Sequence, residues 1–176
     1  MRPTPDLEAL FKAWLEEHRG ILVKVARSYA SSQADAEDLK QELMLQIWAS
    51  LGTFSGQAKP STWIYRVCLN TALTWHRGAI RRARRTGPVA EMGSVASQAS
   101  SPAEDAAKRD LLDRLYAAIQ AMPEFDRALV LLMLDGLAYR EISEVTGLTE
   151  NHVGVALTRA RRRLAELMKG VTDELE

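Results

Sequence analysis

Several features that mark common protein classes are missing from this 176-residue sequence. Cys68 is its only cysteine, so no internal disulfide can form, and we expect a reduced, cytoplasmic protein. No run approaches the roughly 18–20 consecutive apolar residues that span a bilayer, so no membrane insertion is expected. Residues 1–6 contain no apolar stretch of the kind found in a secretory signal peptide.

Signals for an active site are missing too. The histidines, His18, His76 and His152, are too scattered in the sequence to show metal-ligand spacing, and Cys68 falls on an apolar helix face. We find no carboxylate pair, nucleophile elbow or phosphate-binding glycine loop. The sequence therefore predicts a protein without catalysis, cofactor or metal.

Acidic residues are absent between Glu42 and Glu91. The zero net charge conceals this segregation, because residues 1–86 hold 13 basic and 8 acidic side chains while residues 87–176 hold 10 and 15. A solvated face that serves solubility is one interpretation, although mixed signs serve that purpose better. A sustained basic field attracts polyanions, so we favour nucleic acid. The basic side chains in this stretch are Lys59, Arg66, Arg77, Arg81, Arg82, Arg84 and Arg85.

Helical periodicity dominates the chain, and strand signals are nearly absent. We expect a helix over residues 7–31 that breaks near Gly20, a second that starts at Ser32 or Asp35, and a loop over residues 52–60. Further helices are expected at about 61–85, 102–121, 123–135, 138–146 and 150–168.

The stretch from Gly87 to Pro102 is small and polar and is typical of a flexible linker. Ser101, Pro102 and Glu104 have the spacing of a capping box that starts the next helix. The sequence therefore predicts an all-α protein with two small helical domains, residues 1–86 and 103–176, joined by the linker at 87–102.

Residues 139–159 have the spacing of a helix-turn-helix. Gly147 lies where the chain must turn, and Thr149 can cap the second helix. An inward stripe on that helix comprises Val153, Leu157, Ala160, Leu164 and Leu167. A helical hairpin that merely packs is the alternative, but the turn, the cap and an arginine cluster coincide, which favours DNA in the major groove. The residues expected to face DNA are Asn151, His152, Val155, Thr158, Arg159 and Arg162.

From about Leu7 to Leu167 the chain resembles the extracytoplasmic-function group of bacterial sigma factors. Residues 35–48 are similar to the helix that binds the polymerase clamp, residues 54–70 to the segment that melts and reads the −10 element, and residues 122–164 to the −35-reading domain. The resemblance implies that core RNA polymerase and promoter DNA are partners, that the chain performs no catalytic step, and that an anti-sigma protein silences it.

The second helix carries one leucine on its polar face. Leu39, Leu43, Ile47 and Leu51 recur every four residues and are expected to point inward, which turns Leu45 outward. The resemblance identifies the partner of this face as a coiled coil of the largest polymerase subunit; alternatively, another helix of the same domain covers Leu45. The predicted polymerase contacts are Asp38, Gln41, Glu42 and Leu45.

The third helix and the loop before it carry the predicted −10 contacts. Polar side chains form one stripe that can follow a single-stranded backbone, and the loop can capture an unstacked base. Trp63 either stacks on a base or is buried. The stripe comprises Lys59, Thr62, Arg66, Asn70 and Arg77, and the loop comprises Phe54, Ser55, Gly56 and Gln57.

The chain departs from the family pattern in its recognition helix. The family commonly has Lys-Ser-Arg after the central valine, but Gly154-Val155-Ala156 follows Val153 here. Either the −35 sequence that is read is unusual, or binding depends on Arg159 and Arg162. Two other functions stay open: a stand-alone helix-turn-helix repressor, and a sigma-like interaction protein that binds a regulator without touching DNA.

Overall fold

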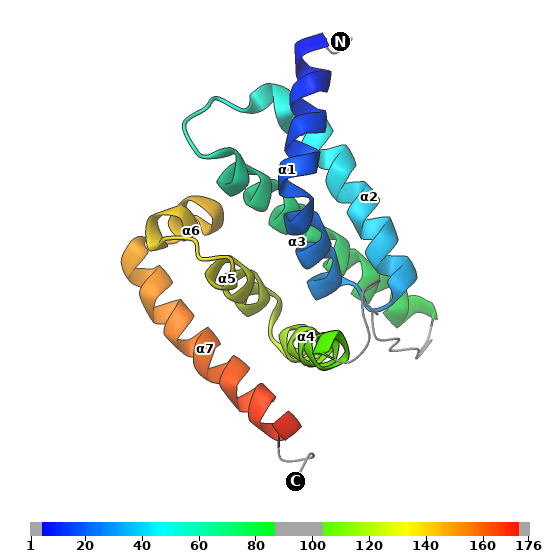
Figure 1. Cartoon of the computed structure of the whole chain (residues 1–176), viewed down its shortest axis with the longest axis vertical. Helices are drawn as coiled ribbons and strands as arrows, with labels where there is room; N and C mark the ends of the chain where they lie inside the picture. The colour runs from blue at the N-terminus through cyan, green and yellow to red at the C-terminus, as the bar shows by residue number, and fades with distance from the viewer. Residues whose placement is uncertain (1–4, 87–103, 173–176) are drawn as a thin grey trace.

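The computed structural model describes residues 5–86 and 104–172, and in both ranges all of the regular secondary structure is helical (Figure 1). This confirms the predicted all-α class. The predicted linker at 87–102 and the predicted capping box at Ser101 lie outside the described residues. The elements are α1 (Pro5–Tyr29), α2 (Gln33–Ser50), the 3₁₀ helix η1 (Leu51–Thr53), α3 (Pro60–Thr86), α4 (Glu104–Ala121), α5 (Glu124–Leu134), α6 (Tyr139–Thr146) and α7 (Glu150–Thr172).

The first three helices pack on one another around the stripe that the sequence predicts. Leu39, Leu43 and Ile47 of α2 and Leu51 of η1 are all buried. Ser32 caps α2, because its hydroxyl oxygen accepts a hydrogen bond from the Asp35 amide at 3.1 Å. The four-residue spacing of these apolar residues places them on one face of the helix, and that face is buried, as the sequence predicts.

The break expected near Gly20 is wrong, because α1 runs without interruption from Pro5 to Tyr29. Glycine in a helix costs about 1 kcal/mol relative to alanine. Ile21 and Leu22, which follow it directly, are buried in the core. Tertiary packing of α1 against α2 and α3 therefore overrides the local preference of one glycine.

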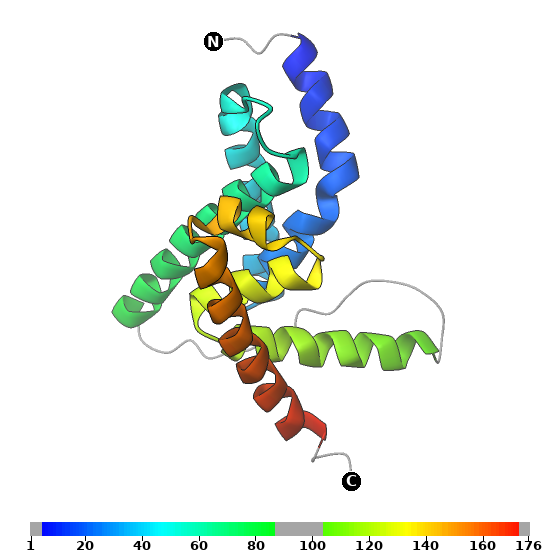
Figure 2. The ribbon, with the colours of Figure 1, turned by 90° about the vertical axis from the view of Figure 1, so that its left-hand side faces the viewer.

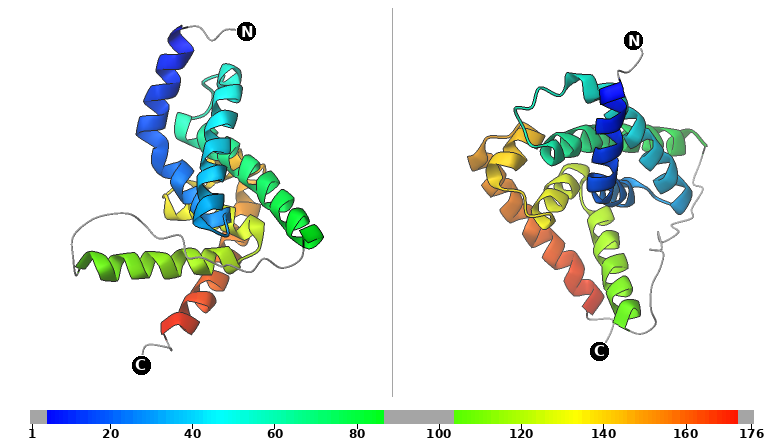
Figure 3. Two further views of the ribbon diagram at one scale, coloured as in Figure 1. Left: turned by 90° about the vertical axis from the view of Figure 1, so that its right-hand side faces the viewer. Right: turned by 45° about the horizontal axis from the view of Figure 1, so that its top comes forward.

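Helices α4 to α7 form a second helical unit. Its core includes Leu129 and Leu132 of α5, Ile142 of α6, and Val153 and Leu157 of α7, each 1% exposed or less. Figure 2 shows α4 extending sideways across the direction of α7, and in Figure 3 both helices lie toward the end remote from the N-terminus.

The two units pack together. α6 lies against α3, and α1 contacts both α4 and α5, as the views of Figures 1 and 3 agree. The apolar cores of the two units join into one cluster. The sequence left open whether the units stay apart; in this structure they form one body.

Candidate nucleic-acid interfaces

An apolar groove lies between α1 and α2. Its hollow of about 480 Å³ is lined mainly by Phe11, Met44, Leu45 and Trp48. The rings of Phe11 and Trp48 meet edge to face, with centroids 5.0 Å apart. Leu45 is 61% exposed, so no described helix of the chain covers it, which excludes the alternative that it is buried. An apolar groove of this kind suits an amphipathic helix of another protein.

Polar side chains accompany this groove on α2. Asp38 and Gln41 are exposed, and Glu42 is partly buried and accepts a hydrogen bond from Gln46 at 3.1 Å. Gln41 lines the groove itself together with Glu8 and Lys12. The structure thus brings Gln41 to the rim of the groove beside Leu45, as the sequence predicts.

Three aromatic rings hold the loop before α3. Phe54 packs edge to face on Trp14 and on Trp63, with ring centroids 4.9 and 5.6 Å apart, and Trp14 meets Trp63 at 5.8 Å. Trp14 is buried and Trp63 partly so. Of the two interpretations of Trp63, the structure supports packing in this aromatic cluster, which fixes the loop to α1.

A second hollow, of about 330 Å³, opens between this loop and α3. Gly56 turns the loop with a φ of 74°, a conformation that glycine adopts without strain. The opposite wall is the start of α3. Because the walls offer hydroxyl, amide and guanidinium groups around an aromatic edge, the hollow can accept an unstacked base. Its lining includes Phe54, Ser55, Gln57, Trp63, Arg66 and Asn70.

The polar stripe of α3 is only partly open. Arg66 and Asn70 are exposed, but Lys59 Nζ lies 2.7 Å from Glu141 Oε1, and Arg77 donates to Glu124 Oε1 at 2.7 and 2.9 Å. Glu141 and Glu124 belong to the C-terminal unit. The hydrogen bond to Glu141, followed by its charge, raises the pKa of Lys59, and the same hydrogen bond from Lys59 lowers the pKa of Glu141.

Thr62 does not lie on an open face, and the prediction that it does is wrong for this arrangement. Thr62 is buried, with only 3% of its surface exposed. α6 packs across this part of α3, and Glu144 shares a hollow with Thr62 and Arg66. A sequence pattern cannot show this, because the helix that covers Thr62 comes from the other unit.

The helix-turn-helix has the expected geometry. Gly147 ends α6 with a φ of 76°, and its amide donates to the Ser143 carbonyl oxygen at 2.8 Å. Thr149 caps α7, because its hydroxyl oxygen lies 3.4 Å from the His152 amide and 3.0 Å from His152 Nδ1. The turn therefore fixes the direction of α7 relative to α6.

The outer face of α7 is open from Asn151 to Arg162. Val155 is 59% exposed, while Val153, Leu157 and Ala160 are buried, which confirms the predicted inward stripe. Two neighbouring arginines are held by the chain: Arg161 donates to Met133 Sδ at 2.8 Å, and Arg163 pairs with Asp126. The predicted reading residues Asn151, His152, Val155, Thr158, Arg159 and Arg162 are all exposed.

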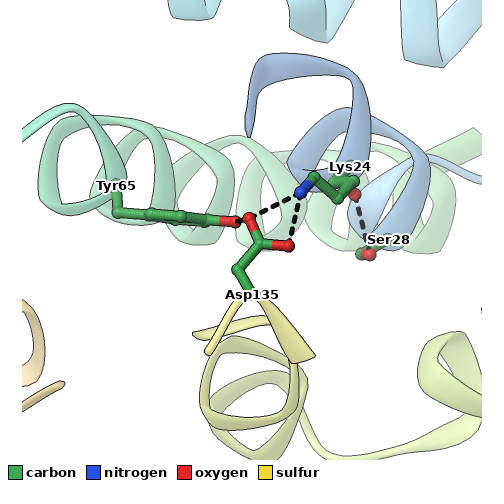
Figure 4. Close-up of polar contacts among 4 residues, drawn as sticks. All are labelled: Lys24, Ser28, Tyr65 and Asp135. Atoms are coloured by element: carbon green, nitrogen blue, oxygen red, sulfur yellow. Dashed lines mark hydrogen bonds and ion pairs between the residues drawn. The ribbon is translucent and has the colours of Figure 1, made fainter. Parts of the chain in front are cut away.

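One polar cluster between the units is not predicted from the sequence. Figure 4 shows Asp135, just after α5, pointing to Lys24 of α1 and to Tyr65 of α3; both contacts are made by its carboxylate. Burial, followed by the Asp135 hydrogen bond, raises the pKa of Tyr65. The hydroxyl therefore stays protonated and donates. No sequence signal links residues so far apart.

Other kinds of site have no support in the described ranges. There, no group of three His, Cys, Asp or Glu side chains could hold a metal ion. Burial raises the pKa of the Cys68 thiol to about 12, so it is not a reactive thiolate. No described helix combines the length and apolar character needed to cross a membrane.

Comparison with known families finds two matches. The model of sigma-70 region 2 matches residues 14–86, and that of sigma-70 region 4 matches residues 112–164, which together make up most of the chain. The first segment holds the loop, α2 and α3, and the second holds the helix-turn-helix.

Curated relatives are similar across the same span. The chain is 28% identical to the ECF RNA polymerase sigma factor SigG of Mycobacterium tuberculosis over 98% of its own length and 52% of that protein. It therefore spans about half the length of this relative. It is also 28% identical to the ECF RNA polymerase sigma-E factor of Escherichia coli, over 74% of this chain and 72% of that one.

Two solved structures share the fold. One is the sigma factor RpoE in complex with the anti-sigma factor NepR from Bartonella quintana, with a TM-score of 0.71 and 20% identity over 94% of this chain and 98% of that one. The other is CnrH in complex with the cytosolic domain of CnrY, with a TM-score of 0.65 and 21% identity over 93% and 90%. At this identity the likeness shows the fold alone.

Proposed function

Since the chain belongs to the extracytoplasmic-function group of the sigma-70 family, we propose that it binds core RNA polymerase and directs it to specific promoters. The single observation that carries the proposal is the outward face of α7. Its open row of amide, apolar and guanidinium side chains is what a helix needs to read base edges in the major groove.

The N-terminal unit would hold the polymerase through the groove between α1 and α2. Leu45 is the exposed apolar centre of that surface, and Asp38, Gln41 and Glu42 supply polar contacts on the same helix. A basic partner helix fits both features, because its apolar face can cover Leu45 while its cations meet the carboxylates.

The −10 element would be opened and read beside α3. The polar hollow under Phe54 would take one base from the displaced strand, and Arg66 and Asn70 at its wall would contact that strand. Exposed arginines at the end of α3, among them Arg81 and Arg85, would contact phosphates without reading sequence.

The C-terminal unit would dock on the −35 duplex. Arg159 and Arg162 would supply the charged contacts that the Gly154-Val155-Ala156 segment lacks. Because the solved relatives carry anti-sigma proteins, we also propose an anti-sigma partner for this chain. The chain would act in the cytoplasm, where the polymerase performs the chemistry, and would have no catalytic step of its own.

Reconstitution with core polymerase tests this function. The purified chain would be added to core enzyme and transcription measured from a panel of promoter fragments, with core enzyme alone as control. We expect promoter-specific initiation that needs both. DNA binding without any effect of core enzyme would indicate a repressor instead, and absence of DNA binding with or without core enzyme would indicate a sigma-like interaction protein.

A further inference from the structure

The middle of the outward face of α7 has no side-chain hydrogen-bond donor left for a ligand. Gly154 has no side chain, and that of Val155 is apolar. Thr158 carries a hydroxyl, but it already donates to the Gly154 carbonyl oxygen at 2.9 Å, within the helix. Ala156 and Leu157, which lie between them, are buried and apolar. This part of the helix therefore presents hydrocarbon where a reading helix commonly presents donors.

Polar groups lie on both sides of this apolar stretch. Asn151 and His152 are exposed at the start of α7, and Arg159 and Arg162 are exposed one and two turns beyond Val155. Val155 itself is 59% exposed, at the centre of the face. A base edge opposite the middle of the helix thus meets a different chemistry from base edges opposite its flanks.

Tyr139 extends the apolar stretch on the side of α6. The turn at Gly147 joins α6 to α7, and the two helices pack on each other (Figure 1). The ring of Tyr139 lies in van der Waals contact with the space beside Gly154, yet Tyr139 is still 42% exposed. Because Gly154 has no side chain, the ring stays beside the residue that precedes Val155.

The major groove offers such a surface one matching group. The C5 methyl of thymine is the apolar group that a base pair presents there, whereas guanine presents two acceptors and cytosine a donor. A face without donors leaves the acceptors of guanine unpaired, which costs free energy when water is excluded. Burial of a methyl group against Val155 is favourable instead.

We propose that this chain selects a thymine in the −35 element through its C5 methyl group, with Val155 and the Tyr139 ring as the contacting side chains. The inference rests on the proposed function and names the base chemistry that the centre of α7 takes. Glycine disfavours a helix, but at position 154 it leaves the ring in place. A lysine there would bring a charged donor to the same surface.

Replacement of thymine by uracil tests this directly, because the two bases differ only in the methyl group. The full chain would be assembled with core polymerase, and the strongest −35 sequence selected from a duplex library with a randomised −35 element. Each thymine of that element, on either strand, is then replaced in turn by uracil, and the Kd of each duplex is measured at one fixed salt concentration. We expect one position at which loss of the methyl weakens binding about fourfold.

Variants assign the contact to its side chains, with circular dichroism to establish folding. Val155→Ala should bind the thymine duplex about fourfold more weakly and no longer distinguish thymine from uracil at that position. Tyr139→Ala should reduce the discrimination, whereas Tyr139→Phe, which keeps the ring, should retain it. The matched control is Val23→Ala, the same change at an exposed valine of α1, and it should alter neither affinity nor discrimination.

The outcomes separate this inference from the proposed function. Equal affinity for thymine and uracil at every position, or a selected element without an A·T pair, would overturn the inference while promoter-specific binding stands. Discrimination that persists unchanged in Val155→Ala would also overturn it, because another residue would then contact the methyl. A polymerase complex that binds no member of the library would instead contradict the proposed function.

Discussion

The ring of Tyr139, the first residue of α6, lies against Gly154 of α7. A Cβ atom placed on Gly154 would stand 3.4 Å from Tyr139 Cε2, an ordinary contact, whereas a longer side chain would meet the ring. The glycine that follows Val153, where the family commonly has lysine, leaves this space to the ring. The tyrosine occupies the space beside the helix that the longer side chain would need.

Substitutions of Gly154 can distinguish the effect of helix propensity on stability from the effect of the contact with the Tyr139 ring. Gly154→Ala should raise the free energy of unfolding by up to about 1 kcal/mol, because alanine is the better helix former and its Cβ fits. Gly154→Lys should lose part of that gain, since it must displace Tyr139. Adding Tyr139→Ala should restore it. Denaturant unfolding of wild type, Gly154→Lys, Tyr139→Ala and the double variant forms the cycle, and strict additivity would mean that the two residues do not interact.

Leu45→Glu should weaken binding to core polymerase by at least about tenfold, because a carboxylate would stand at the centre of the apolar groove. The helical circular dichroism should not change, since Leu45 is exposed. Val23→Glu is the matched control, an exposed apolar residue of α1 outside the groove lining. Equal losses in both variants would exclude the groove as the docking surface.

His76 should make the stability depend on pH. Burial, and then the Arg127 charge, hold the pKa of His76 below its usual 6.5, while its Nδ1 lies 3.2 Å from the Tyr29 carbonyl oxygen. Above pH 6.5 neither state binds the proton. Below pH 6.5 the unfolded chain takes up the proton before the folded chain does. The free energy of unfolding therefore decreases as the pH is lowered, until the pKa of His76 in the folded chain is reached.

His76→Gln should remove this part of the acid destabilisation. The free energy of unfolding would be measured between pH 7.5 and 5.0 for wild type, for His76→Gln and for His152→Gln, in which an exposed histidine is changed. We expect a shallower pH dependence for His76→Gln alone. The same slope in wild type and His76→Gln would show that His76 titrates normally in the folded protein.

Local features of the fold and the sites could be predicted from the sequence, and features that join the two units could not. The spacing of Leu39 and Leu43 indicates a buried stripe, and Gly147 with Thr149 indicates the turn and the cap, because each rests on neighbours along one helix. Leu45 follows from the same periodicity, as the residue left outside the stripe.

Thr62 shows where such reasoning ends. Periodicity assigns it to the polar stripe with Arg66, but α6 of the other unit covers it. Tyr65 is buried in the core, yet its hydroxyl bonds to Asp135, 70 positions away. Contacts of this kind depend on how the two folded units dock on each other, and the residue pattern within a single helix does not predict that docking.

Two arginines of α7 are expected to contact DNA in different ways, one through base edges and the other through phosphates. Arg159 is exposed one turn beyond Val155, within reach of base edges, whereas Arg163 lies on the flank and is paired with Asp126. Arg159→Ala should therefore cost about 1–3 kcal/mol and relax the preference at one −35 position. Arg163→Ala should weaken all sequences alike and make the salt dependence shallower by about one contact.

Both variants would be assembled with core polymerase and bound to a library of −35 sequences at two salt concentrations. A bidentate contact to guanine is lost only at the position that carries the guanine, so the Arg159→Ala profile should differ from wild type at that position and nowhere else. A phosphate contact is the same for every sequence, so Arg163→Ala should shift the whole profile evenly. Even shifts from both substitutions would remove Arg159 as a reader of bases. No loss from either would mean that α7 does not enter the major groove by this face, because Arg159 and Arg163 belong to the exposed arginine cluster of the helix.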